Sequence, residues 1–132
     1  MRLLIPFLLI GLLLPLTVSA ERGWQLAAKD QRASLYFSPD SVETTNERTD
    51  VALVRNFHKP ISASSGPLAS VFEMVAINCQ TLRITVTSTL FFKRDFARGE
   101  RIELTPRERQ RIPPLDQNLP PLFLMQVCGF SA

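Results

Sequence analysis

The sequence predicts an α+β domain in which a short C-terminal helix lies on an antiparallel β-sheet that has one face in water. Two patterns favour this fold class. Between Thr81 and Phe92, apolar residues alternate with threonine and arginine, which is typical of a strand that buries only one side. From Leu122 to Val127, a proline-led segment predicts a helix whose apolar side chains need a sheet to cover.

The first 20 residues have the pattern of a secretory signal. Arg2 gives a positive start, residues 3–16 are an apolar run, and small residues at Val18 and Ala20 predict cleavage after Ala20. The alternative is a retained membrane anchor. Cleavage is favoured because the run is shorter than the ~20 residues that span a bilayer and contains two prolines. We therefore expect a signal peptide at 1–20 and a single exported domain at 21–132, without a later membrane span.

Strand patterns and turn signals recur along the first part of the mature chain. Strands are expected at 24–28, 35–37, 51–58 and 71–77. Ser38-Pro39-Asp40 predicts a turn, and the polar run 43–50 has the composition of a hairpin loop. Residues 59–67, which are rich in Pro, Ser and Gly, are expected to form an irregular surface loop.

The second part of the chain begins with the clearest strand, 81–92, which the link at residues 78–80 joins to 71–77 as a hairpin. Its apolar face is expected to hold Leu82, Ile84, Val86, Leu90 and Phe92, and its polar face Thr81, Arg83, Thr85, Thr87 and Thr89. Residues 93–99 predict a charged turn and 100–104 a short strand. Asn118 is expected to cap the last helix.

Cys79 and Cys128 are the only cysteines in the 132-residue chain. An even number of cysteines behind a secretory signal favours a disulfide over free thiols. In the chain-entropy model, closing a loop of this length stabilises the fold by about 4 kcal/mol. The alternative is a nucleophilic Cys79 with His58, the only histidine, as its base; we favour the disulfide with a solvent-facing His58.

Other chemistries lack the residues that they need. There is no C-x-x-C motif, no closed set of zinc ligands, no calcium-loop spacing and no glycine-rich phosphate loop. We therefore expect no enzyme activity, no metal and no cofactor. The net charge of +3 is mild, and it does not by itself predict binding to nucleic acid.

Taken in order, these features resemble a known family. The order runs from LYFSPDSV through VALVRNF and FEMVAINCQTLRITVTSTLFF to a proline-rich approach to a last helix that ends in Cys128. From Trp24 to Cys128 the chain resembles the bacterial surface-adhesin protein E family, and Asn78-Cys79 between two strands is the clearest shared motif.

The resemblance implies an antiparallel sheet of about six strands, with the C-terminal helix held on its inner face by a Cys79–Cys128 disulfide. It also implies a non-catalytic binding domain. The adhesin after which the family is named is lipid-anchored and binds host matrix proteins and haem. This chain has no cysteine near the cleavage point to carry a lipid, so we expect a periplasmic or secreted protein of the Gram-negative envelope.

Two surfaces are candidates for a partner, each with an ordinary solvated surface as the alternative. A basic set could hold an anionic envelope component: Lys93, Arg94, Arg98, Arg101, Arg107, Arg109 and Arg111. A polar strip could take part in strand addition or protein contact: Arg83, Thr85 and Thr87.

We therefore predict a binding or interaction domain whose partner is an unknown protein or an anionic envelope component. A homodimer is a candidate assembly. The alternatives are a structural accessory subunit of an envelope complex and, less favoured, a small periplasmic enzyme.

Overall fold

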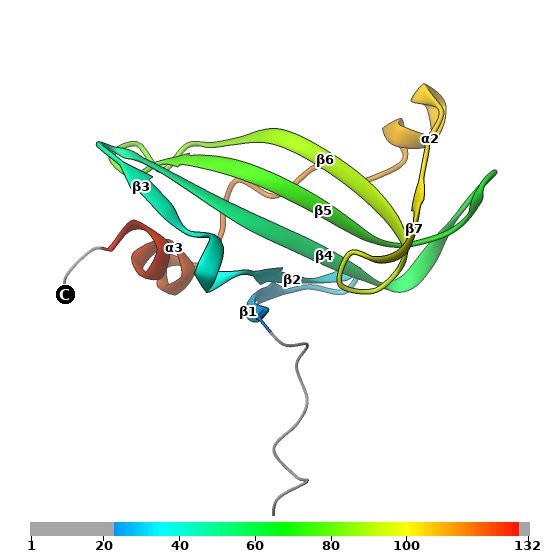
Figure 1. Ribbon diagram of the computed structural model, residues 1–132, viewed down its shortest axis with the longest axis horizontal. Coiled ribbons are helices and arrows are strands. Elements are labelled where there is room, and N and C mark those ends of the chain that lie inside the picture. Colours follow the sequence, from blue (N-terminus) through cyan, green and yellow to red (C-terminus); the bar gives the residue numbers. More distant parts are fainter. Residues whose placement is uncertain (1–22, 130–132) are drawn as a thin grey trace, which may run out of the picture.

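The structure is a computed structural model that describes residues 23–129, and the expected signal peptide at 1–20 lies outside these residues. The described strands form one antiparallel sheet in the spatial order β1–β2–β4–β5–β6–β7, and β3 pairs with β4 beside this path (Figure 1). The strands are β1 (Gln25–Lys29), β2 (Ala33–Phe37), β3 (Glu43–Thr45), β4 (Arg48–Ala63), β5 (Gly66–Asn78), β6 (Ile84–Arg94) and β7 (Arg98–Ile102). The helices are the short 3-10 helix η3 (Pro39–Ser41), α2 (Pro106–Gln110) and α3 (Pro121–Cys128).

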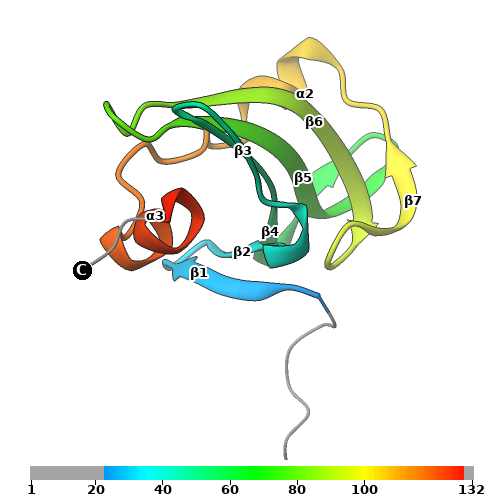
Figure 2. The same cartoon turned by 60° about the vertical axis from the view of Figure 1, so that its left-hand side comes forward.

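The sheet is curved, and α3 lies inside its curve (Figure 2). Three residues of α3 are buried, namely Phe123, Leu124 and Val127. They form one core cluster with buried sheet residues: Leu35, Phe37, Val51, Leu53, Val75, Ile77 and Ile84. Because removing apolar surface from water is the main stabilising effect in folding, the helix and this half of the sheet stabilise each other. The predicted α+β class, with its antiparallel sheet and C-terminal helix, is confirmed.

A second core cluster lies further along the concave face. Its buried members are Phe57, Leu68, Val71, Ile102 and Leu104. Side chains alternate along a strand, so Leu53, Arg55 and Phe57 of β4 point to the same face. Arg55 therefore lies between the two clusters, where its Nε atom is 2.9 Å from Oε1 of the buried Glu73. A buried ion pair thus divides the core.

The predicted irregular loop at residues 59–67 is wrong, because β4 and β5 continue through it as one long hairpin. The pairing register shifts between Asn56 and Ile61, and Pro60 lies within this irregularity. Proline has no backbone N–H, and it is tolerated there because the two strands do not form a regular hydrogen-bond ladder at this point. The polar run 43–50 also forms a hairpin, and its turn is confined to residues 46–47.

The single apolar face predicted for residues 82–92 is also wrong. The register changes within β6, since Val75 lies opposite Val86 whereas Met74 lies opposite Ser88. Thr87 is therefore an extra residue in a β-bulge. An extra residue reverses the alternation of side chains that follow it, because their period is two. As a result Phe91 packs against the second core cluster. The alternation predicts instead that Leu90 and Phe92, on either side of Phe91, face the core.

The helix α2 is not among the predicted elements, although its sequence carries a start signal. The Thr105 hydroxyl accepts the N–H of Glu108 at 3.1 Å, and Glu108 Oε1 accepts the N–H of Thr105 at 3.0 Å. This capping box precedes a helix with Pro106 in its first turn. The last helix is confirmed but its predicted cap is wrong, since Pro120 rather than Asn118 occupies the N-cap of α3.

Candidate binding site

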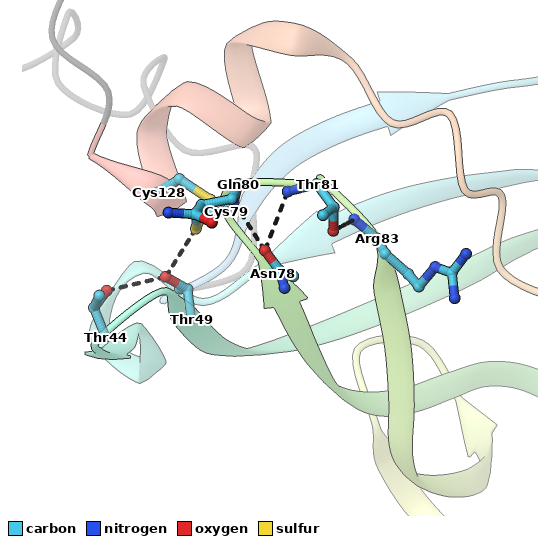
Figure 3. The surroundings of a disulfide bond; sticks show 8 residues. All are labelled: Thr44, Thr49, Asn78, Cys79, Gln80, Thr81, Arg83 and Cys128. Atoms are coloured by element: carbon cyan, nitrogen blue, oxygen red, sulfur yellow. Dashed lines mark hydrogen bonds between the residues drawn. A yellow bond between two sulfur atoms is a disulfide. The ribbon is translucent and has the colours of Figure 1, made fainter.

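A disulfide joins Cys79, just after β5, to Cys128, the last residue of α3 (Figure 3). The sulfur atoms are 2.04 Å apart and the Cα atoms 5.7 Å apart. Asn78 shapes the turn around Cys79, because its Oδ1 atom accepts the N–H groups of Gln80 at 2.9 Å and Thr81 at 3.1 Å. The predicted pairing is confirmed, and the Asn78-Cys79 motif is a turn that anchors the last helix.

The alternative Cys79–His58 catalytic pair does not form. The Cys79 sulfur lies 3.3 Å from Oγ1 of Thr49, near the start of β4. His58 lies nine residues further along the same strand, a separation of about 30 Å at the usual rise per residue. Its ring lies between a hydroxyl and a carbonyl, with Nε2 3.0 Å from Ser34 Oγ and Nδ1 3.2 Å from the carbonyl of Gln31. A carbonyl only accepts hydrogen bonds, so Nδ1 carries a proton.

The predicted basic set is divided between the two ends of β7. Lys93, Arg94 and Arg98 lie around the β6–β7 turn, whereas the members from residue 107 onward lie on α2 and directly after it. Several members contact neighbours: Lys93 Nζ is 3.4 Å from Glu100 Oε1, and the Arg109 guanidinium lies 5.8 Å from the centre of the Phe91 ring. Anion binding by the set remains a prediction.

The predicted polar strip does come together in space. Arg83, Thr85 and Thr87 line one shallow hollow of about 330 Å³, which Arg48 of β4 also lines. Thr87 is the bulged residue of β6, and its hydroxyl donates to the carbonyl of Met74 at 3.1 Å. The partner contact predicted for this strip remains a prediction.

Beside this strip lies an open sheet edge. β7 pairs with β6 only between Phe91 and Arg94, so within residues 23–129 the edge of β6 from Ile84 to Leu90 has no neighbouring strand. The Gln117 side chain occupies its first position. The N–H of Ile84 donates to Gln117 Oε1 at 3.1 Å, and Gln117 Nε2 donates to the carbonyl of Ile84 at 2.9 Å. One side-chain amide thus forms both hydrogen bonds that a paired strand would form.

A second hollow, which we call the basic hollow, was not predicted as a site, although one of its lining residues, Arg111, belongs to the predicted basic set. It has a volume of about 410 Å³, and its lining residues are Gln31, Arg32, Phe57, His58, Lys59, Ile61, Arg111 and Pro113. Three segments far apart in the sequence supply its cations: the β1–β2 turn, the second half of β4 and the chain after α2. No Asp or Glu is among the lining residues.

The cations of the basic hollow have few partners. None of the ion pairs found in residues 23–129 includes Arg32, Lys59 or Arg111. Arg111 makes one long hydrogen bond, from Nη2 to the carbonyl of Ser62 at 3.4 Å. The nearby Asp30 carboxylate accepts the N–H groups of Ala33 and Arg32, and these bonds lower the pKa of Asp30. The charges of His58 and Arg32 also lower the pKa of Asp30, so one carboxylate lies near this side of the basic hollow although it does not line it.

An adjoining hollow of about 280 Å³, which we call the apolar hollow, lies between the β1–β2 hairpin and the proline-rich connection before α3. Arg32, Phe57 and Pro113 line both hollows, so the two lie side by side. Most of the other lining residues are apolar: Ala28, Ala33, Leu35, Pro114, Leu115, Leu119 and Pro120. The remaining lining residues of this hollow are polar or charged, namely Lys29, Asp30, Arg55, Asp116 and Asn118. Together the two hollows form a groove in which one part has cations and no lining carboxylate, and the other has charges of both signs among apolar side chains.

Residues 23–129 bring together no set of three or more His, Cys, Asp or Glu side chains suited to a metal ion. Over the same residues, every helix is too short or too polar to cross a bilayer.

Comparison with solved structures identifies the fold. A crystal form II structure of Haemophilus influenzae protein E superimposes with a TM-score of 0.63 at 16% identity, covering 85% of this chain and 94% of that one. Another structure of the same protein gives a TM-score of 0.53 at 19% identity, covering 64% of this chain and 67% of that one. A structure of protein E from non-typeable Haemophilus influenzae gives 0.51 at 19% identity, covering 67% of this chain and 70% of that one.

The family comparison agrees with the fold. None of the curated proteins matches this sequence. The family model described as Surface-adhesin protein E matches residues 24–128, which include every described strand, all of α3 and both cysteines. The resemblance noted in the sequence is confirmed, and the chain belongs to the surface-adhesin protein E family.

Proposed function

We propose that this protein is an exported, non-catalytic domain of the Gram-negative cell envelope that binds the oxyanion group of a partner in the basic hollow. The observation that carries the proposal is the gathering of Arg32, Lys59 and Arg111 around one concavity without a lining carboxylate. Like charges in a concave site raise the local potential and attract anions. An arginine fork binds carboxylate or phosphate oxygens in two places, which adds orientation to attraction.

His58 lines the same hollow with a fixed ring orientation. Its two ring nitrogens are held by Ser34 and by the Gln31 carbonyl, so the ring is oriented rather than free to rotate. Family membership and the signal pattern at residues 1–20 support export. Mass spectrometry of the protein from the periplasmic fraction should find a chain that begins at Glu21.

The anion site is tested by titrating the mature domain with inorganic phosphate and with acetate, followed by NMR. We expect both anions to shift the resonances of Arg32, His58 and Arg111. Replacing Arg32, Lys59 and Arg111 with Gln should abolish the shifts. The matched control replaces Arg94, Arg101 and Arg107 with Gln, which removes the same charge from the predicted basic set and should leave binding intact. Loss of binding in the control alone would move the site to that set and refute the proposal.

A structural accessory subunit is the second candidate function, and the open edge of β6 favours it. An edge without a neighbouring strand can pair with a strand from another protein. Val86 lies on this edge and is 38% exposed. Lysine is common at natural edges that avoid pairing, so Val86→Lys should reduce recovery of a stoichiometric partner from crosslinked cells. Unchanged recovery, with the fold intact by circular dichroism, would refute pairing through β6.

A further inference from the structure

We infer that the ligand of the groove is a single-chain anionic amphiphile, with its oxyanion in the basic hollow and its aliphatic chain in the apolar hollow. This inference rests on the proposed function and names the class of ligand. It follows from three observations: the position of the two hollows side by side, the hydrogen bonds of the polar groups that line them, and the side chains that form the walls.

The two hollows adjoin at a defined place. Phe57 and Pro113 line both, so apolar side chains lie where the two hollows meet. Arg32 lies at the same junction. A head group bound by Arg32 can therefore continue directly into a chain that lies against the ring of Phe57. The volumes of the two hollows together fall in the usual range for a small-molecule site.

Three polar lining residues of the apolar hollow, Arg55, Asp116 and Asp30, already make hydrogen bonds within the protein. Arg55 donates to Glu73 at 2.9 Å and to the carbonyl of Pro113 at 2.6 Å. Asp116 accepts the N–H of Asn118 at 2.9 Å, and Asp30 accepts two backbone N–H groups of its own turn. A guest in this hollow therefore meets its alanine, leucine and proline side chains, with Lys29, Arg32 and Asn118 as the other polar contacts. A guest in the basic hollow meets cations without ion-pair partners among residues 23–129.

The side chains that form the wall of the apolar hollow favour an aliphatic chain over water as its occupant. Alanines of β1 and β2 form one side, and the leucines and prolines of the connection form the other. Small side chains and prolines leave space that they cannot fill themselves, since neither can extend into it. A site needs several polar partners to hold water well, and this wall supplies few that are not already bonded.

The inference is tested by isothermal titration of the disulfide-bonded mature domain with acetate, hexanoate and decanoate. Each methylene that enters an apolar site raises affinity about fourfold. We expect decanoate to bind at least tenfold more tightly than hexanoate. A smaller rise would overturn the inference while leaving the anion site in place. If neither these carboxylates nor phosphate binds, the proposed function fails as well, so the two failures are distinguishable.

Two groups of variants test separately where the head group binds and where the aliphatic chain binds. Lys59→Gln with Arg111→Gln should weaken all three carboxylates by a similar factor. Ala28→Phe, which fills the apolar hollow, should remove the tenfold difference and leave acetate unchanged. Ala28→Leu provides a smaller change in case the larger one does not fold. A chain-length effect that survives both fillings would overturn the placement of the chain.

Two sources could supply such an amphiphile, and further titrations distinguish them. A lysophosphatidylglycerol represents a lipid head group with one chain, and decanoate represents a free fatty acid. Decyltrimethylammonium has the same chain with a cationic head and should bind at least tenfold more weakly than decanoate. Equal binding of the cationic and anionic amphiphiles would show nonspecific hydrophobic association and overturn the inference.

Discussion

The two halves of the concave face are closed in different ways. In one half, α3 covers the sheet with Phe123, Leu124 and Val127, and a disulfide holds the end of the helix to the turn after β5. In the other half, the proline-rich connection and α2 cover the sheet through scattered hydrogen bonds. Hollows border both covers, since the groove lies beside the connection and a further hollow of about 690 Å³ is lined by α3, the connection and the turn before β6. The comparison shows that a helix and an irregular segment cover the same sheet through different contacts, apolar packing in one half and hydrogen bonds in the other.

The ion pair between Arg55 and Glu73 forms the boundary between these halves. Both side chains are almost fully buried, at 10% and 5% exposure. A buried pair of this kind adds little net stability, because the desolvation of two charges offsets their attraction. Its second bond, from Arg55 to the carbonyl of Pro113, holds the connection against the sheet. The pair therefore positions the wall of the groove more than it stabilises the fold.

The largest effect on stability is expected from removing the disulfide in the half of the concave face that α3 covers. Replacing Cys79 and Cys128 with Ser should lower the free energy of unfolding by about 4 kcal/mol, because the unfolded chain loses a long closed loop. Urea denaturation followed by circular dichroism measures the loss, and reduction of the unaltered protein should reproduce it. Stability equal to that of the oxidised protein would show that packing of α3 alone closes this half.

The next effect concerns the boundary. Glu73→Leu leaves the buried Arg55 without its carboxylate and should cost about 3 kcal/mol. Replacing both residues with Leu should recover most of the lost stability, since no buried charge is then unpaired. Urea titration of the single and double variants gives the comparison. Equal losses in both would mean that the packing of Glu73, and not its charge, matters at the boundary.

A smaller effect on stability is expected in the half of the concave face that the connection and α2 cover. Thr105→Ala removes the cap of α2 and should cost about 1 kcal/mol, whereas Thr105→Ser keeps the hydroxyl and should cost less. Glu108 also accepts the N–H of Ser64 at 2.7 Å, which ties α2 to the tip of the β4–β5 hairpin. Hydrogen exchange at Ser64 should therefore quicken in the Ala variant. Unchanged exchange there would refute this link.

The smallest effects are opposite responses to pH. Burial raises the pKa of Glu73 above 4.5, so its contribution to stability is present below that pH and is lost as pH rises through the raised value. Hydrogen bonds from Thr105 and Ser64 lower the pKa of Glu108, so its contribution is present above 4.5 and is lost as pH falls through the lowered value. Unfolding measured across acidic pH should show the first trend removed by Glu73→Gln and the second by Glu108→Gln. The same change in both variants would contradict this assignment.

Local patterns were enough to predict most of the strands and the last helix. Alternation over residues 51–58 identifies a strand because side chains on a half-buried sheet must repeat with a period of two. The same reasoning fails at Thr87, since an extra residue is set by the pairing with β5 and leaves no mark in its own strand. It also fails at residues 59–67, where long-range pairing overrides the turn-forming composition.

The basic hollow was beyond the reach of local patterns for a different reason. Arg32, Lys59 and Arg111 belong to separate segments, and each is an ordinary charged residue in its own surroundings. Only the topology, which brings the β1–β2 turn beside the second half of β4, places these residues around one hollow. The helix α2 was within reach, because Thr105 and Glu108 have the spacing of a capping box.

The contact between Gln117 and Ile84 has a consequence for aggregation between copies of the chain. A long, β-prone strand with a free edge is a template for aggregation between copies of a chain. Natural proteins often protect such edges with lysine, proline or a covering loop. Here the Thr87 bulge bends the edge, and a glutamine from the connection satisfies both backbone groups where the edge begins. The connection that forms one wall of the groove thereby also covers the first position of this edge, and within the described part of the chain residues 85–90 remain open to pairing.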